Sequence, residues 1–243
     1  MKVLLRIIIL FLVFYLIFYL IPFSHVKPDT IFYPSEDKLW MHRLLDPKNE
    51  NDNLEEFTGY EIDVFYNKKK NIFEVKHHGK DYKHTLLSLF SEFRSLEGKY
   101  FWIDFKNLDS MNVEESVLLL KRITEQYQLR DNIIVESKKI ETLHKFKENG
   151  FAISYWLPNY HFFGVLSNSF MITNNIIKYK PTAISCDYNS LHFYLKKFPN
   201  YSINCWTNDL TSEKDKQKIV NLSKNKNIKI ILVDFKKNFL ITR

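Results

Sequence analysis

Short apolar segments alternate along most of the chain with longer segments whose apolar residues recur at helical spacing. The short segments are rich in β-branched and aromatic residues, which is typical of strands. Eight of them are expected as strands, over residues 39–43, 60–65, 100–105, 132–135, 151–155, 182–186, 202–206 and 228–234. The intervening spacing predicts helices over residues 84–96, 113–127, 139–149, 191–197 and 212–223, a helical or irregular stretch up to about residue 179, and at most two helical turns over 53–57.

This alternation predicts an α/β fold. Eight strands with helices between them point to a compact (β/α)₈ TIM barrel. A doubly wound open sheet is the runner-up. It fits less well because the chain has 5 glycines and no glycine-rich phosphate loop.

Residues 59–79 are typical of a strand, a polar turn and a returning strand. Glu61 and Asp63 are two residues apart on the first strand, so both carboxylates project from one face. Like charges on one face repel each other, and a divalent cation between them is a common solution. The returning strand ends in His77-His78, which brings an imidazole to the same end of the sheet.

An unbroken apolar run over residues 7–23 follows Lys2 and Arg6. It meets the roughly 17–25 residues that a membrane span requires and exceeds the signal-peptide core of about 7–15 residues. Because positive charge precedes the run, we expect a single-pass signal anchor with the following domain outside the cytoplasm. Secretion after signal cleavage is the alternative. This divides the chain into a membrane anchor, a stalk and a barrel domain over residues 1–24, 25–37 and 38–243.

The formal net charge of +7 and the isoelectric point near 9.1 suit anionic partners such as phosphates or acidic lipid surfaces. A nucleic-acid partner is not expected, because there is no zinc-finger spacing and no long basic helix. Cys186 and Cys205 show no C-x-x-C spacing and no disulfide framework. Two buried thiols are therefore expected, and pairing across neighbouring strands is the alternative.

In such a barrel, chemically active side chains gather at the C-terminal ends of the strands. Those ends carry His42, Arg43, Glu61, Asp63, His77, Asp104, Lys106, Glu136, Tyr155, Trp156, Asp187, Trp206 and Asp234. Carboxylate oxygens suit Mg²⁺ or Ca²⁺, and the histidines are too few for a zinc site. A hard cation and basic side chains neutralise a phosphoryl group while imidazoles transfer protons, so this set predicts phosphodiester cleavage.

Five short motifs follow one another along the chain: His42-Arg43, Glu61-x-Asp63, His77, Asp104-x-Lys106 and Trp206-Thr207-Asn208. This order resembles the glycerophosphodiester phosphodiesterase family, which belongs to the phospholipase C-like barrel phosphodiesterases. The resemblance extends from about residue 39 to the end of the chain, and its strength lies in the ordered set. Asp rather than Glu before x-Lys is similar to the spider-venom phospholipase D branch.

The resemblance implies a role for each of eight side chains and a metal-dependent hydrolysis of a glycerophosphodiester or lysophospholipid-like head group. It implies Mg²⁺ or Ca²⁺ ligands at Glu61, Asp63 and Asp104, a catalytic pair at His42 and His77, phosphate contacts from Arg43 and Lys106, and a pocket wall at Trp206.

Three departures from the family pattern bear on the substrate. Leu44 replaces the glycine of His-Arg-Gly and is expected to crowd a place where the family has no side chain. The usual Glu-Asn-Thr is missing from the region of residues 51–54, and His78 replaces the Asp after the second histidine. Because the acids and both histidines are retained, these changes affect the identity of the substrate more than the type of reaction.

Other interpretations of the same residues stay open. The acids and Lys106 would form plain salt bridges at the barrel mouth if no cation binds, His42 would be a satisfied core histidine, and Trp206 would be core. A one-residue slip would exchange His77 for His78. Glu136, Tyr155 and Asp234 are expected to pack or hydrogen-bond rather than to catalyse.

Two other functions stay open as well. A catalytically degenerate barrel that binds a phosphorylated ligand or a partner is the main alternative, and Leu44 and the missing Glu-Asn-Thr are its support. A glycosidase using two carboxylates also fits a barrel. It leaves His42, His77 and Lys106 without a role.

Overall fold

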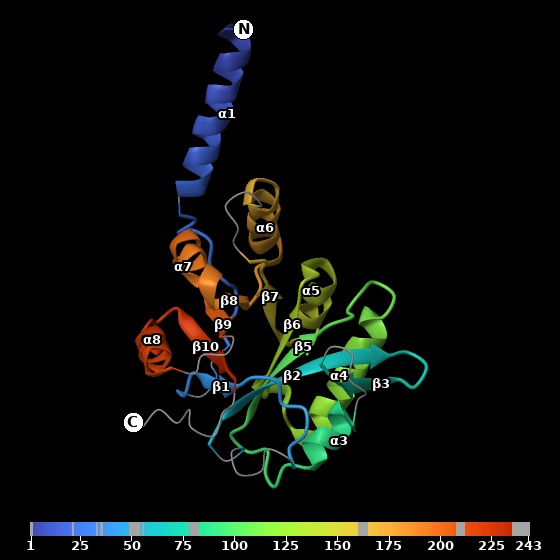
Figure 1. Cartoon of the computed structure of the whole chain (residues 1–243). Helices are drawn as coiled ribbons and strands as arrows, with labels where there is room; N and C mark the ends of the chain where they lie inside the picture. Colours follow the sequence, from blue (N-terminus) through green and yellow to red (C-terminus); the bar gives the residue numbers. More distant parts are fainter. Residues whose placement is uncertain are drawn as a thin grey trace.

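The computed structural model describes residues 2–20, 22–32, 34, 36–48, 54, 56–77, 83–159, 165–207 and 212–234. Within these residues, eight parallel strands close into a barrel with helices around it (Figure 1). In their order around the ring the strands are β1 (Leu39–Met41), β10 (Ile228–Val233), β9 (Ile203–Trp206), β8 (Ala183–Asp187), β7 (Ala152–Trp156), β6 (Ile133–Ser137), β5 (Tyr100–Phe105) and β2 (Gly59–Asn67). Pairing of Met41 with Tyr60 joins β1 to β2 and closes the ring. The predicted TIM barrel is confirmed, and the open sheet is excluded.

Strand β2 is long enough to serve both the barrel and a hairpin. Its first part pairs with β1 and β5, and its last residues pair antiparallel with β3 (Ile72–Val75). The predicted hairpin is therefore confirmed over the residues that the structure describes, up to residue 77.

The helix predicted over residues 84–96 is shorter than expected. His84 and Thr85 form strand β4 (His84–Thr85), which pairs with β3, and helix α3 covers Leu86–Ser91. The Thr85 hydroxyl accepts a hydrogen bond from the Ser88 N–H, so Thr85 caps the helix and fixes its start. The ladder with β3 therefore overrides the helical spacing at residues 84 and 85.

The remaining helices follow the pattern of apolar positions. They are α4 (Val113–Tyr127), α5 (Ile140–Glu148), α6 (Val165–Tyr179), α7 (Tyr188–Lys197) and α8 (Glu213–Ser223), and a short 3₁₀ turn, η1 (Arg130–Asn132), precedes β6. Figure 1 shows α3 and α4 on one side of the barrel and α8 on the other. The helical turns predicted over residues 53–57 include residues 53 and 55, which lie outside the described residues.

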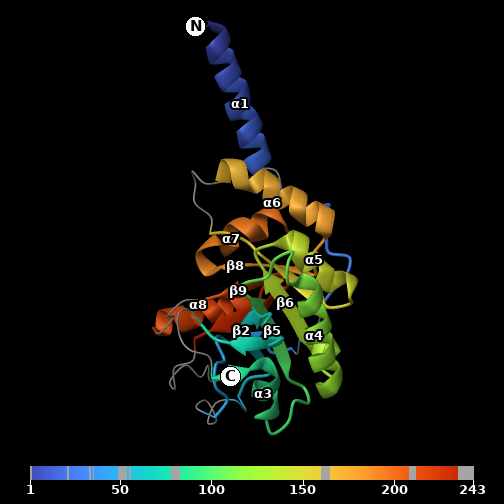
Figure 2. The ribbon, with the colours of Figure 1, turned by 90° about the vertical axis from the view of Figure 1, so that its right-hand side faces the viewer.

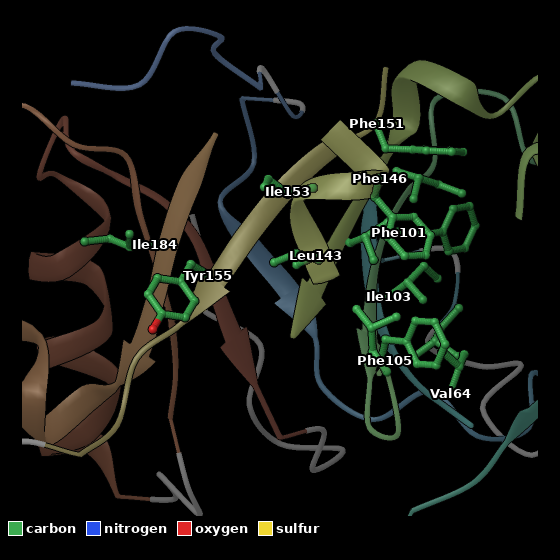
Figure 3. Close-up of a cluster of buried hydrophobic side chains, with 14 of the residues drawn as sticks. Val64, Phe101, Ile103, Phe105, Leu143, Phe146, Phe151, Ile153, Tyr155 and Ile184 are labelled. Carbon is green, nitrogen blue, oxygen red and sulfur yellow. The ribbon is translucent and has the colours of Figure 1, made fainter. Parts of the chain in front are cut away.

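The larger apolar core lies between the strands and the helices (Figure 3). The ring of Phe146 on α5 has its centroid 6.1 Å from that of Phe105 on β5 and 6.0 Å from that of Phe151. All three side chains are buried. This packing holds β5 in place, and β5 carries Asp104 on its opposite face.

A smaller cluster fills the barrel interior around the buried indoles of Trp40 and Trp102. Trp102 precedes Asp104 by two residues, so the indole lies below the carboxylate on the same face of β5. Gly59 opens β2 beside Trp40, and a Cβ at residue 59 would lie 2.0 Å from the Trp40 ring. Glycine is therefore required there by the close approach of the Trp40 indole.

The N-terminal apolar run forms helix α1 (Lys2–Leu20), which projects from the barrel (Figures 1 and 2). Among the described residues, no helix has both the length and the apolar character needed to cross a membrane. The predicted membrane span is thus not supported by the structure.

Several described residues of the segment 25–37, which was expected as a stalk, contact the barrel domain. Val26 joins the larger core, and Phe32 joins the interior cluster. The Asp29 carboxylate lies 3.3 Å from the ammonium groups of both Lys147 and Lys180.

Cys186 and Cys205 lie opposite each other on β8 and β9. Both are buried free thiols, as expected. Burial, with a contribution from Asp187, raises the pKa of Cys205 to about 12, so this thiol stays protonated near neutral pH.

Candidate active site

A cavity of about 460 Å³ opens at the C-terminal ends of the barrel strands. It is lined by every side chain to which the sequence assigned a role: His42, Arg43, Glu61, Asp63, His77, Asp104, Lys106 and Trp206. The structure therefore brings the predicted residues together at one mouth of the barrel. Their individual roles remain predictions.

Three carboxylates form the acidic centre of this cavity. Glu61 and Asp63 are two residues apart on β2, and Asp104 lies opposite Asp63 in the ladder between β2 and β5. One oxygen from each carboxylate lies within 4.8 Å of the others. Glu61 is 2% exposed and Asp63 is 1% exposed, so water screens their charges weakly.

The ammonium group of Lys106 faces two of these carboxylates. Lys106 Nζ lies 2.5 Å from Asp63 Oδ1 and donates a hydrogen bond to Asp104 Oδ2. Burial opposes the charged form of Lys106, but Asp104, Asp63 and Glu61 outweigh it and raise the pKa of Lys106. Burial likewise opposes ionisation of Asp63, but Lys106 outweighs it and lowers the pKa of Asp63. Lys106 and Asp63 thus form a charged pair.

The other two acids have raised pKa values. Burial, followed by repulsion from Asp63 and Asp104, raises the pKa of Glu61 well above its usual range. Burial and the charge of Asp63 raise the pKa of Asp104, although Lys106 opposes this shift. The plain salt-bridge interpretation pairs Asp63 and Asp104 with Lys106, whereas Glu61 relieves the repulsion in the cluster by retaining its proton.

A divalent cation would stabilise the ionised forms of all three carboxylates. The donor set consists of carboxylate oxygens within 4.8 Å of one another, which are the ligands that Mg²⁺ and Ca²⁺ prefer. The residues present therefore fit the predicted cation at Glu61, Asp63 and Asp104.

His42 follows β1 and is fixed by Asp234, which follows β10. His42 Nδ1 lies 2.8 Å from Asp234 Oδ1, and Arg43 Nη1 lies 3.6 Å from the same oxygen. The His42 side chain is 8% exposed and lines the cavity. Because Nδ1 is engaged, Nε2 is the ring nitrogen that can exchange a proton with a ligand. Asp234 is a hydrogen-bonding residue, as expected.

Arg43 adopts a left-handed backbone conformation, with φ of 61°. Its N–H donates to Glu61 Oε2 at 2.7 Å, and the Leu44 N–H donates to the Glu61 carbonyl at 2.8 Å. Leu44 is fully buried in the larger apolar core and does not line the cavity. The expectation that Leu44 crowds the site is wrong, because the turn at Arg43 directs the next side chain into the core.

His77 reaches the cavity from the end of β3. The antiparallel register pairs Val75 with Val64, and the Lys76 N–H donates to the Asp63 carbonyl. His77 Nδ1 lies 2.5 Å from Asp63 Oδ2. His78, Asn208 and residues 51–53 lie outside the described residues.

An aromatic wall stands across the cavity from the carboxylates. The indoles of Trp156 and Trp206 stack with centroids 5.7 Å apart and planes inclined by 7°. Lys138 Nζ lies 3.9 Å from the centroid of the Trp156 ring. The sequence assigned a role to Trp206 alone. Trp156 was expected at a strand end but was given no role, and Lys138, which directly follows β6, was not singled out.

Glu136 is a further buried acid of the cavity. It lies opposite Asp104 in the ladder between β5 and β6, and its Oε2 accepts a hydrogen bond from the Ser185 hydroxyl. Burial and repulsion from Asp104 raise the pKa of Glu136 well above its usual range. Glu136 thus forms a hydrogen bond, as expected.

No family model matches the sequence, and no curated protein matches it either. The fold, however, is similar to that of several solved phosphodiesterases. A glycerophosphodiester phosphodiesterase from Parabacteroides distasonis superposes with a TM-score of 0.59 at 14% identity, covering 85% of this chain and 96% of the other.

Two further solved structures agree. An Oleispira antarctica phosphodiesterase in complex with the product sn-glycerol-3-phosphate gives a TM-score of 0.55 at 13% identity, over 80% of this chain and 92% of the other. A calcium-dependent phosphoinositol-specific phospholipase C from Pseudomonas sp gives 0.51 at 10% identity, over 83% and 90%. At these identities the likeness establishes the fold, and it confirms at that level the resemblance predicted from the motifs.

Proposed function

We propose that this chain is a divalent-cation-dependent phosphodiesterase that hydrolyses glycerophosphodiesters or lysophospholipid-like esters. The observation that carries the proposal is the cluster of Glu61, Asp63 and Asp104, which shares one cavity with His42, His77, Arg43 and Lys106. The similarly folded proteins include glycerophosphodiester phosphodiesterases, one of them holding sn-glycerol-3-phosphate, and this supports the same reaction class here.

In this proposal Glu61, Asp63 and Asp104 hold Mg²⁺ or Ca²⁺. When bound, such a cation polarises a phosphoryl oxygen and neutralises part of its charge. Lys106 and Arg43 donate charge-assisted hydrogen bonds to the non-bridging oxygens of the diester. Without a cation, Lys106 balances negative charge of the cluster. A bound cation would take over this role, and the Lys106 ammonium would become available to the phosphate.

The two histidines divide the proton transfers. Displacement at phosphorus places the attacking and leaving oxygens on opposite sides, so two separate groups are needed. His42, oriented by Asp234, removes the proton from the attacking oxygen, and His77, oriented by Asp63, protonates the leaving alcohol oxygen. In each ring, the hydrogen bond at Nδ1 fixes the orientation of the imidazole. The two imidazoles therefore reach the diester from different strands.

A barrel that only binds a phosphorylated ligand is the alternative. One of its two supports disappears, because Leu44 lies in the apolar core and leaves the cavity open. We therefore favour turnover.

The proposal is tested with the full-length chain. Glycerophosphodiesters with several alcohol groups are incubated with Mg²⁺ or Ca²⁺, and phosphomonoester release is followed by ³¹P NMR. A phosphomonoester product supports the proposal. No product from any diester, with retained binding of sn-glycerol-3-phosphate, would support the binding-only alternative.

The cellular location stays a prediction from the sequence, in which Lys2 and Arg6 favour a domain outside the cytoplasm. Protease added to intact cells should then digest the domain. Protection of the domain until the membrane is breached would contradict this location.

A further inference from the structure

We infer that Lys138, together with the stacked indoles of Trp156 and Trp206, selects the alcohol group of the substrate: it favours a hydroxyl-rich, neutral or anionic alcohol and disfavours a quaternary ammonium. This inference rests on the proposed phosphodiesterase function and narrows its substrate class.

The position of the indoles follows from the order of the strands. Counting round the ring, β8 stands opposite β2, and Trp156 and Trp206 end the two strands that flank β8. The carboxylates lie on β2 and its neighbour β5. A diester whose phosphorus lies beside the carboxylates and Lys106 therefore directs one of its arms across the cavity to the indoles.

The indole pair forms an apolar part of the cavity wall. The two planes differ by only 7°, and both rings are partly buried at the cavity wall. Such a surface packs against the C–H groups of a sugar-like or polyol alcohol, while the hydroxyl groups of that alcohol point to polar neighbours. By itself, the same surface would also suit a cationic head group, because indole faces attract cations.

Lys138 decides between these two kinds of alcohol. Its ammonium lies 3.9 Å from the Trp156 centroid, at the place over the ring that a ligand cation would take. A quaternary ammonium brought to this wall meets a like charge, and it cannot accept a hydrogen bond. A hydroxyl or an anionic group accepts one from Lys138. Lys139, the next residue along the chain, also lines the cavity, so a second basic side chain adds to this preference.

The test compares two diesters of the same glycerol phosphate. Glycerophosphoinositol carries a polyol, and glycerophosphocholine carries a quaternary ammonium. We expect the wild-type ratio of kcat/KM to favour the inositol ester by about tenfold or more, and Lys138→Met to reduce that ratio by about tenfold. Lys138→Arg keeps the charge and should keep the preference. Lys224→Met is the matched control, because Lys224 is exposed and precedes β10 at the opposite end of the barrel.

Two results would overturn the inference: a wild-type preference for the choline ester, or a ratio that Lys138→Met leaves unchanged. Failure to hydrolyse either ester would instead count against the proposed function. Dissociation constants of the same two esters, measured by calorimetry in EDTA for wild type and Lys138→Met, then decide the inference independently of turnover.

Discussion

Asp63 and Asp104 lie directly opposite each other on neighbouring parallel strands, and the Lys106 ammonium contacts both carboxylates. Glu61 joins them so that oxygens from three carboxylates lie within 4.8 Å. Like charges this close and this well buried repel strongly. The response of the protein to pH and to cations should therefore depend on this cluster.

The first prediction concerns the pH dependence of stability. The pKa of Glu61 is raised in the folded chain. At a pH between the unfolded pKa near 4.5 and the higher folded pKa, the native state therefore binds more protons than the unfolded state. The contribution of Glu61 to the free energy of unfolding is thus fully present below that unfolded value and is lost as pH rises, by up to about 1.4 kcal/mol per pH unit. Glu61→Gln lacks this loss. In EDTA, its free energy of unfolding should therefore rise relative to that of the wild type as the pH is raised from 5 to 8.

Urea unfolding of both proteins across this pH range makes the measurement. Saturating Mg²⁺ or Ca²⁺ should reverse the order at pH 8, because the cation stabilises the ionised cluster of the wild type. A stability difference that changes neither with pH nor with cation would contradict the assignment.

The second prediction concerns His42 and His77. Alanine at either position should lower turnover of an alkyl diester by about 10²–10⁴-fold, because each imidazole moves one proton. The double variant should be little worse than the poorer single variant, since the two act as a unit. An aryl leaving group departs without protonation, so an aryl diester should largely rescue His77→Ala and not His42→Ala.

These assays compare alkyl and aryl diesters at saturating cation. Rescue of His42→Ala instead would exchange the two roles. If neither variant slows the alkyl ester, the histidine pair is not catalytic.

The third prediction concerns the fit between Gly59 and Trp40. A Cβ at residue 59 would lie 2.0 Å from the Trp40 ring, so Gly59→Ala should lower the free energy of unfolding by about 1–3 kcal/mol. The double variant Gly59→Ala/Trp40→Phe should lose less than the sum of its single variants, because the smaller ring makes room. Additive losses in urea unfolding would show that the two residues do not press on each other.

Much of the candidate site could be predicted because it depends on local periodicity. Side chains two residues apart on a strand share a face, which places Glu61 with Asp63 and Asp104 with Lys106. The barrel then brings the strand ends together. His77 follows from the hairpin register.

The remainder depends on contacts that the local pattern does not encode. Leu44 turns into the core because Arg43 has a left-handed φ, which residue type alone does not reveal. Asp234 reaches His42 across 192 positions because closure of the ring sets β10 beside β1. The Lys138–Trp156 contact likewise joins the ends of two neighbouring strands.

The central claim is that a cation held by Glu61, Asp63 and Asp104 supports phosphodiester hydrolysis. The most direct measurement is the rate of glycerophosphodiester hydrolysis by the full-length chain with excess EDTA and after Mg²⁺ or Ca²⁺ is restored. Asp104→Asn is measured alongside, with the exposed Asp131→Asn as its matched control. We expect EDTA to abolish activity, the cation to restore it, and Asp104→Asn to lose at least about tenfold in both turnover and cation affinity while the control keeps both. Full activity in EDTA, or an unimpaired Asp104→Asn, would contradict the claim.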